Sequence, residues 1–441
     1  MKIILLSWLT FFSVICSIAQ TNTKTFELMA VAEGNFGTPN GDIFNVASQA
    51  SASSLTTGPF YGTANNLPGL DVLQDFQIIG DKAILLSKAN TYKVVVVDYP
   101  SFTNVATFTN IGAPQTLTDA GETKAYVSTS NNSSKLYQID LVTNTTTPVV
   151  DPTNAANSYS NYMLYANGAV YVVYGTKIVK VDVTTNTVTS VIQPNIGAIE
   201  GIQYDAENNN VWLLGKVAST STLLKMDVAN NDVLSTPITL TGVSNAKQLR
   251  FAKHKLYFLN NGSVHLYTIN TPNIPTTGIY TTAFTGYGAA YGKAFTVDPE
   301  SGDFAIGSAN NFSADSSYEI VDGTTYQLIE TGNITGCKIV NELSLKTFDK
   351  LSVGDHNVSI NYVVYPNPTK DILNIRLDTK SIGSAYTVTL INPWGATVKQ
   401  VNSINNNSTI DVSDLASGIY FAQIKEANST KSIVKKVVIT H

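Results

Sequence analysis

The segment KIVKVDVTTNTVTSVI, residues 177–192, decides the fold because its pattern recurs along most of the chain. A strand with alternating apolar residues ends at an acid or amide, and a polar turn and a polar strand follow. Seven copies of the strand that ends in Asp or Asn occur: GDIFN, KVVVVD, KLYQID, KIVKVD, LLKMD, HLYTIN and YEIVD. They end at Asn45, Asp98, Asp140, Asp182, Asp227, Asn270 and Asp322. These ends are 42 to 53 residues apart, which is typical of four-stranded propeller blades. We therefore predict an all-β chain that contains a seven-bladed β-propeller.

Each repeat has the same internal order. An inner strand precedes a strongly apolar strand such as VYVVY (170–174) or VWLLG (211–215), and the strand ending in Asp or Asn comes third. We expect the apolar strands to be buried between blades. We expect the closing Asp and Asn side chains to accept hydrogen bonds from turn N–H groups, rather than to act in catalysis or bind metal. Since no segment has sustained helical periodicity, very little helix is predicted.

Ring closure needs a strand from the far end of the repeat region. The first repeat, FELMAVAEGNF (26–36), lacks an inner strand before it, while CKIVNEL (337–343) follows the last repeat. An open ring would leave unpaired strand edges. We expect Cys337–Leu343 to complete the first blade, with the propeller spanning residues 20–343 and a linker spanning residues 344–361.

Residues 362–441 form a different unit. About six short strands separated by turn residues, including ILNIRL, YTVTLIN and GIYFAQIKE, predict a small immunoglobulin-like β-sandwich.

The N-terminus is predicted to be a signal peptide, residues 1–19. Lys2 precedes an apolar run from Ile3 to Cys16, and small residues lead to a cleavage site between Ala19 and Gln20. The alternative is a membrane anchor, for which the run is short. Removal of the leader leaves 26 basic and 32 acidic residues, a net charge of −6, which argues against nucleic acid or an anionic membrane as partner. Cys337 is then the one remaining cysteine, so no intramolecular disulfide is expected.

Two propeller families share short motifs with the chain. The turn VDVTTNTVTSVI (181–192) resembles the repeats of YVTN-family propellers. The opening AEGNFGTPNGDIF (32–44) is similar to the start of Bacteroidetes propellers that include surface cobalamin-binding lipoproteins. Because these motifs are structural, the resemblance implies a fold more than a ligand.

The last residues resemble another family. YPNP (365–368), NPWGATV (392–398), IDVSDLASGIYFAQI (410–424) and KSIVKKVVI (431–439) are similar to the type A sorting domain of the Bacteroidetes type IX secretion system, with Asn392 replacing the usual Asp of one turn. The resemblance implies recognition by the outer-membrane translocon, passage through the periplasm of a Gram-negative bacterium, and either anchoring on the cell surface or release. The residues that it implicates in sorting are Gly418, Tyr420, Lys431, Lys435 and Lys436.

No motif identifies an enzyme or a metal site. The four histidines have no metal-ligand spacing. VDPESGD, with Asp298, Glu300 and Asp303, is the nearest approach to a calcium loop, but its residues are ordinary in turns. We predict no catalytic residue, metal or cofactor.

The candidate site follows from propeller geometry, because the starts of the inner strands converge on one funnel. The predicted funnel residues are Gln74, Asp75, Gln115, Asn161, Tyr162, Glu200, Gln248 and Lys293, with Glu33, Asn35 and Phe36 at its mouth. Such amides suit a neutral polar ligand, and a glycan, a corrinoid or a protein is the expected partner. The alternatives are a channel that binds only water, a lactonase-like or lyase-like enzyme using Glu200 and Asp75, and an adhesive or structural surface protein.

Overall fold

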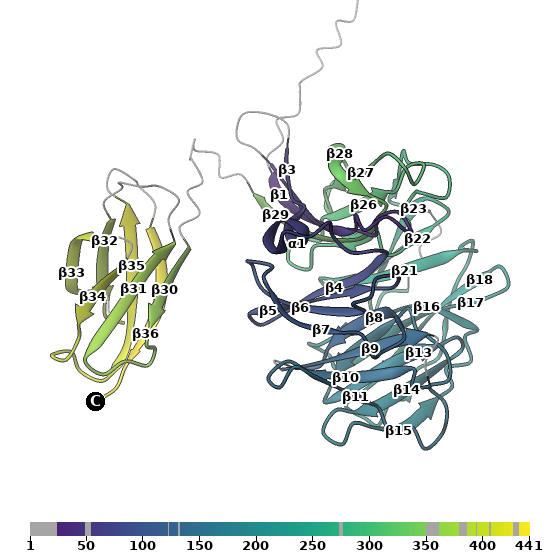
Figure 1. The fold of residues 1–441 in the computed structure, drawn as a ribbon, viewed down its shortest axis with the longest axis horizontal. Helices are drawn as coiled ribbons and strands as arrows, with labels where there is room; N and C mark the ends of the chain where they lie inside the picture. Colours follow the sequence, from purple (N-terminus) through teal and green to yellow (C-terminus); the bar gives the residue numbers. More distant parts are fainter. Residues whose placement is uncertain are drawn as a thin grey trace, which may run out of the picture. The chain divides into compact units, whose positions relative to one another are not determined.

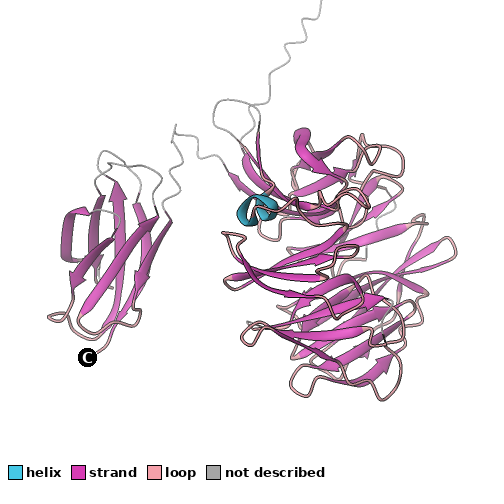
Figure 2. Ribbon diagram, in the orientation of Figure 1, coloured by secondary structure: helices cyan, strands magenta, loops and turns pink. Residues whose placement is uncertain are grey.

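The computed structural model describes residues 24–48, 54–121, 123–130, 133–272, 277–349, 361–378, 386–393, 395–404, 407–426 and 432–441. Two compact units contain them, one within residues 1–352 and the other within residues 353–441 (Figure 1). Figure 2 shows that strands are the main secondary structure of both units and that loops connect them. The single helix of the described residues, α1 (Phe60–Asn65), begins where Asp42 accepts hydrogen bonds from the N–H groups of Tyr61 and Gly62. In the described part of the chain, no helix is long and apolar enough to span a membrane.

Seven antiparallel sheets form the first unit, and each is one blade of a β-propeller. The strands of each blade are given from the inner to the outer one. Blade 1 contains β29 (Val340–Asp349), β1 (Lys24–Ala32), β2 (Asp42–Ala47) and β3 (Leu55–Thr57), and blade 2 contains β4 (Leu73–Ile79), β5 (Lys82–Ser87), β6 (Val94–Asp98) and β7 (Asn104–Phe108). Blade 3 contains β8 (Ala113–Asp119), β9 (Lys124–Ser130), β10 (Leu136–Asp140) and β11 (Thr145–Pro148), and blade 4 contains β12 (Met163–Ala166), β13 (Ala169–Tyr174), β14 (Lys177–Asp182) and β15 (Thr187–Ile192).

Blade 5 contains β16 (Ala198–Asp205), β17 (Asn210–Val217), β18 (Thr220–Asp227) and β19 (Val233–Leu234), and β20 (Ile238–Leu240) also pairs with β18. Blade 6 contains β21 (Ala246–Ala252), β22 (Lys255–Asn260), β23 (Ser263–Thr268) and β24 (Tyr280–Thr281). Blade 7 contains β25 (Phe295–Val297), β26 (Phe304–Ser308), β27 (Asp315–Val321) and β28 (Leu328–Lys338). The predicted order of strands within each repeat is therefore confirmed.

The closing Asp residues cap turns as predicted in four repeats. Asp140, Asp182, Asp227 and Asp322 each accept hydrogen bonds from backbone N–H groups two or three residues further on. For Asp140 and Asp182 these bonds, led by those from Thr143 and Thr185, hold the pKa of the carboxyl below its ordinary value. Capping of a turn is thus seen for four of the seven closing residues, whereas Asp98 pairs with Lys82 at 2.5 Å.

Ring closure occurs at the predicted place but with a different strand. β29 pairs with β1 over its whole length, from Lys24 opposite Asp349 to Ala32 opposite Val340. The predicted range Cys337–Leu343 is wrong, because Cys337 and Lys338 belong to the outer strand β28, and Ile339 (φ 58°) makes the corner between the two strands. The expected linker also begins too early, since residues 344–349 are strand. No Gly or Pro marks this corner, so the apolar sequence conceals it.

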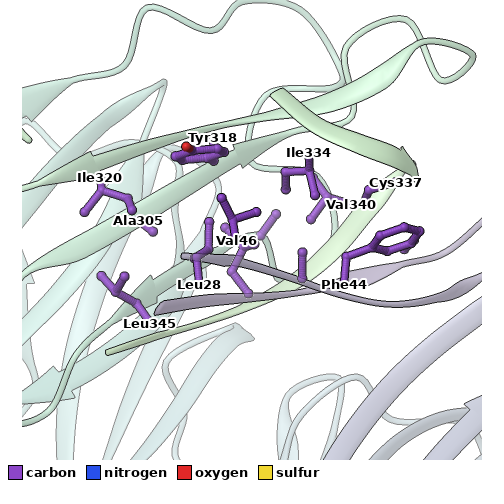
Figure 3. Close-up of a cluster of buried hydrophobic side chains, with 14 of the residues drawn as sticks. Leu28, Phe44, Val46, Ala305, Tyr318, Ile320, Ile334, Cys337, Val340 and Leu345 are labelled. Carbon is purple, nitrogen blue, oxygen red and sulfur yellow. The ribbon is translucent and has the colours of Figure 1, made fainter. Parts of the chain in front are cut away.

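Each pair of neighbouring blades shares a buried apolar cluster, including blades 7 and 1. In that last interface Leu28 and Val46 of blade 1 pack with Tyr318 and Ile334 of blade 7 (Figure 3). The other six clusters join blades 1 and 2, 2 and 3, 3 and 4, 4 and 5, 5 and 6, and 6 and 7. Seven interfaces between seven blades make a closed ring.

A group of acids in blade 7 holds both end strands of the ring. Asp298 and Asp303, both buried, accept hydrogen bonds from Thr347 of β29: its N–H to Asp298 (2.9 Å) and its hydroxyl to Asp303 (2.6 Å). Asp303 also pairs with Lys24 of β1 at 2.7 Å. Thr347, Ser301 and the backbone of Glu300 outweigh burial and lower the pKa of Asp298. Two of the three carboxylates of the calcium-like segment, those of Asp298 and Asp303, therefore bind protein groups.

The second unit is a β-sandwich. One sheet has the order β30 (Asn361–Tyr365), β31 (Ile372–Asp378) and β34 (Asn407–Asp411), and the other has the order β33 (Thr397–Ile404), β32 (Tyr386–Ile391), β35 (Gly418–Glu426) and β36 (Ser432–Ile439). Leu373 and Ile410 of the first sheet and Val388, Ile424 and Val437 of the second lie in one buried core. The predicted immunoglobulin-like sandwich is confirmed.

Removal of the Thr347 hydroxyl should weaken the attachment of β29 to blade 7. Thr347→Val keeps the shape of the side chain but removes the donor to the two buried carboxylates, which is expected to lower the free energy of unfolding by about 1–3 kcal/mol. Urea unfolding of the full chain measures this change. Ser344→Ala, an exposed position on the same strand, is the control. Equal urea midpoints for the two variants would contradict a stabilising role for the Thr347 hydroxyl.

Candidate functional site

Each of the seven blades brings one polar side chain to the axis of the ring, from its inner strand or, for Tyr162 and Lys293, from the residues just before that strand. We call these residues the axial cluster: Glu342, Asp75, Thr116, Tyr162, Glu200, Arg250 and Lys293, from blades 1 to 7 in that order. Their contacts cross the ring. Lys293 of blade 7 pairs with Asp75 of blade 2 and lies 3.3 Å from the hydroxyl of Thr116 in blade 3. Side chains from blades that are not neighbours can meet in this way only at the axis.

β-Bulges aim several of these side chains. The inner strands lose register with their neighbours between Leu73 and Asp75, between Pro114 and Thr116, between Ile199 and Gly201, and between Lys247 and Arg250. A bulge adds one unpaired residue and turns the following side chain. Because the bulge recurs at the same place in four blades, it moves polar residues of the inner strands toward the axis.

Asp75 is the centre of one half of the cluster. Its side chain is almost fully buried, and its Oδ2 atom accepts hydrogen bonds from the Thr116 hydroxyl (2.7 Å) and the Leu117 N–H (2.9 Å). The same atom contacts the ammonium group of Lys293. Asp75 thereby joins blades 2, 3 and 7, and its charge is fully engaged by protein groups.

Glu342 shares this half of the cluster. Its Oε2 atom lies 3.8 Å from Lys293 Nζ. Burial raises the pKa of Glu342 to about 8; Lys293 lowers that pKa and the neighbouring Asp75 carboxyl raises it. Burial alone would lower the pKa of Lys293, but Asp75 and Glu342 outweigh it and raise the pKa. The Lys293 ammonium group therefore faces two carboxyl groups, that of Asp75 in direct contact and that of Glu342, whose pKa is raised.

The other half of the cluster surrounds Tyr162. Burial and the charge of Glu200 raise the pKa of the Tyr162 phenol, while Arg250 and Lys293 oppose that rise. Arg250 donates to the carbonyl oxygens of Leu249 (2.9 Å) and Lys293 (3.3 Å). Burial lowers the pKa of its guanidinium, and Glu342 counteracts this effect. An anion, two cations and a phenol thus lie near one another at the axis.

A second polar group lies where the first blade begins. The Glu33 carboxyl interacts with Tyr291 and Gln74, and burial raises its pKa. Burial and Glu33 raise the pKa of Tyr291 to about 12. Asn35 donates to the Phe312 carbonyl (2.8 Å), and Phe312 lies edge-on to Tyr291. Phe36 is 85% exposed.

The remaining predicted funnel residues have structural contacts or none. Gln248 donates to the Ala290 carbonyl at 2.7 Å, and Gln115 is buried 3.4 Å from the Ser130 hydroxyl. Asn161 is exposed. Of the predicted set, Asp75, Tyr162, Glu200 and Lys293 belong to the axial cluster. Binding of a ligand by any of them stays a prediction.

Sequence reasoning missed Thr116, Arg250 and Glu342. Thr116 and Arg250 come one and two residues after the predicted amides Gln115 and Gln248, because each bulge shifts the side-chain alternation. Glu342 lies in the predicted closing segment, where a single acid among apolar residues was the available signal. The site is therefore charged rather than a ring of amides.

The C-terminal unit places the predicted sorting residues mainly on two paired strands. Gly418 and Tyr420 are on β35; Tyr420 is buried in the core and donates to the Ala416 carbonyl at 2.9 Å. Lys435 and Lys436 are exposed on β36. Lys431, Ala19 and Gln20 lie outside the described residues. Asn392 serves as the usual Asp would, since its side chain accepts from the Ala396 N–H.

Asn367 of the YPNP segment holds the last strand. Its amide donates to the Lys436 carbonyl (2.9 Å) and accepts from the Val438 N–H (2.8 Å). Thr369 continues this contact, because its N–H donates to the Val438 carbonyl (2.9 Å) and its carbonyl accepts from the Thr440 N–H. The segment therefore covers the edge of β36.

The raised pKa of Glu342 predicts a pH-dependent effect of Glu342→Gln. In the unfolded chain the carboxyl ionises near 4.5, but in the folded protein it stays protonated to about pH 8. The wild-type protein therefore loses folding free energy as pH rises through this interval, whereas the glutamine variant does not. Chemical unfolding should find the variant more stable, relative to wild type, at pH 8 than at pH 5. The control is Glu300→Gln, and a reversed trend would refute the assignment.

Loss of the Asn367 side-chain amide should weaken the hydrogen bonding of β36. Asn367→Ala removes both amide contacts with β36, each worth about 0.5–1.5 kcal/mol. Amide hydrogen exchange at Val438 is expected to accelerate by about tenfold or more, while Lys436→Ala, which keeps its backbone carbonyl, should leave the rate close to wild type. An unchanged exchange rate of the Val438 amide in the Asn367 variant would contradict a stabilising role for these two hydrogen bonds.

Comparisons with known proteins agree with the fold of the two units. The family model for the secretion system C-terminal sorting domain matches residues 363–440. No curated protein matches the chain. Among solved structures, a quinonprotein alcohol dehydrogenase-like protein from Bacteroides thetaiotaomicron is 12% identical with a TM-score of 0.51, covering 73% of this chain and 90% of its own. A protein from Lactobacillus plantarum, also 12% identical, has a TM-score of 0.53 and covers 73% of this chain and 99% of its own.

These structural similarities support the propeller fold alone, whereas the family match covers the sandwich. The chain therefore ends in a type IX sorting domain, which directs its export to the cell surface or out of the cell.

Proposed function

We propose that this protein is an exported propeller that captures a ligand at the axial cluster. The observation that carries the proposal is the meeting of seven polar side chains from seven blades at one place. Such a cluster is costly to bury unless its groups are paired, and a preorganised set of donors and acceptors reduces the cost of binding. The propeller would act as the receptor, and the C-terminal unit would deliver it outside the cell.

The route and the boundaries are part of this proposal. Residues 1–19 would be the signal peptide for passage to the periplasm, with cleavage between Ala19 and Gln20, and the type IX machinery would then recognise residues 362–441. The turn at 181–192 supports assignment of the repeats to the YVTN type.

The enzyme alternative depends on the carboxylates of Asp75 and Glu200. Asp75 is a poor candidate for a general base, since two hydrogen bonds and the Lys293 charge engage the Oδ2 atom and the Phe76 N–H donates to Oδ1. Among the described residues, no second carboxylate is paired with Glu200 and no hydrogen bond orients its carboxylate for proton transfer. The geometry therefore supports capture better than catalysis.

The test is a thermal-shift screen of the full chain against glycans, corrinoids, haem and divalent ions, because a ligand that binds only the folded state raises the melting temperature. Tyr162→Phe should abolish or reduce the shift given by a true axial ligand, since it removes the hydroxyl at the centre of the cluster and keeps the ring. Tyr165→Phe on strand β12 is the matched control. A ligand whose shift is the same in all three proteins binds elsewhere, which would contradict axial capture.

A further inference from the structure

We propose that the axial site takes a small zwitterion, whose anionic group binds Arg250 and whose cationic group binds Glu200. This inference rests on the proposed function and narrows it to a class of ligand. It follows from which charges of the axial cluster are paired and which are left over.

The Lys293 charge is already paired. It contacts Asp75 directly and lies 3.8 Å from Glu342, and these three groups fill one half of the axial cluster. A ligand would gain little by competing with Asp75 for Lys293, because separating a buried pair leaves both charges without a partner. The other half of the cluster is therefore where ligand charges can be accommodated.

Arg250 has hydrogen bonds but no counter-ion in contact. Its guanidinium donates to two main-chain carbonyls, and no carboxylate of the described residues lies within 4 Å of it. A guanidinium has five N–H donors, so these two bonds leave donors for a ligand. A carboxylate matches the geometry of that fork and would supply the missing charge.

Glu200 is the complementary case on the neighbouring blade. Within the described part of the chain its carboxylate has no hydrogen-bond or ion-pair partner, although it lies in the bulge of an inner strand. An ammonium group on the ligand would provide both the charge and the donors that this carboxylate lacks.

Glu200 and Arg250 flank a direct contact between two inner strands, because Gly201 packs against Leu249. Tyr162 packs against the neighbouring cluster of blades 4 and 5. A purely anionic ligand would leave Glu200 unpaired, and a purely cationic one would leave Arg250 unpaired. A molecule with both charges pairs both groups, and its zero net charge avoids long-range repulsion from a chain of net charge −5.

The experiment uses ω-amino acids of increasing length as probes of the full chain. Glycine, 4-aminobutyrate and 6-aminohexanoate carry both charges, hexanoate and hexylamine carry one each, and glucose carries none. Isothermal titration should find that at least one of the three zwitterions binds at least tenfold more tightly than hexanoate, hexylamine or glucose. Weaker or equal binding of every zwitterion would overturn the proposal.

Two substitutions assign the ends of the ligand. Glu200→Gln and Arg250→Gln should each weaken binding of the zwitterion at least tenfold, and Glu200→Gln should remove the advantage of the zwitterion over hexanoate. Glu207→Gln and Lys253→Gln, both exposed, are the matched controls and should bind as wild type. If Arg250→Gln fails to fold, Glu200→Gln still decides the question, because the Glu200 carboxylate makes no hydrogen bond or ion pair with the described residues.

The failure of this inference can be separated from that of the proposed function. If a glycan, corrinoid or haem gives a shift that Tyr162→Phe abolishes while no zwitterion binds, axial capture stands and the zwitterion assignment is wrong. If zwitterions bind with equal affinity to wild type and both glutamine variants, they bind elsewhere and the assignment is also wrong. If no probe of any class binds, both proposals fail.

Discussion

The pairing of β29 with β1 is the interaction on which the rest of this structure depends. It joins residues more than 300 positions apart in the sequence and supplies the first blade with the inner strand that its own repeat lacks. The buried cluster between blades 7 and 1 and the hydrogen bonds of Thr347 reinforce it from both sides. Without this strand the ring would have an unpaired edge at its axis, and Glu342 would not reach the axial cluster.

Closure also explains why the axial site is charged. Once seven inner strands surround one axis, the polar side chains that the bulges turn inward lie close to one another and are largely buried. Low polarity strengthens attraction between opposite charges and penalises an unpaired one. Lys293 meets this constraint by pairing with Asp75. The raised pKa of Glu342 lets that carboxyl keep its proton. Arg250 and Glu200 have no ion-pair partner within 4 Å among the described residues, which is the reason that we propose a ligand at this half of the cluster.

The C-terminal unit meets the edge problem in its own way. The end of β36 is covered by a short segment in which Asn367 bonds the strand with its side chain and Thr369 bonds it with its backbone. The two units therefore bury separate cores and protect separate edges. The sandwich is the sorting domain, and ligand capture is the function that we propose for the ring.

Local pattern in the sequence was enough to determine the repeats, the Asp-capped turns and the sorting motifs, because a strand's alternation and a turn's hydrogen bonds involve residues close together in the chain. It also indicated that a late strand closes the ring. Only the tertiary structure decided where that strand begins, since Ile339 turns a corner that no Gly or Pro marks. The same holds for the axial site: the bulges before Thr116 and Arg250 shift the alternation, and the contacts of Lys293 cross the ring. Those contacts depend on closure, which is a property of the whole ring and of no single repeat.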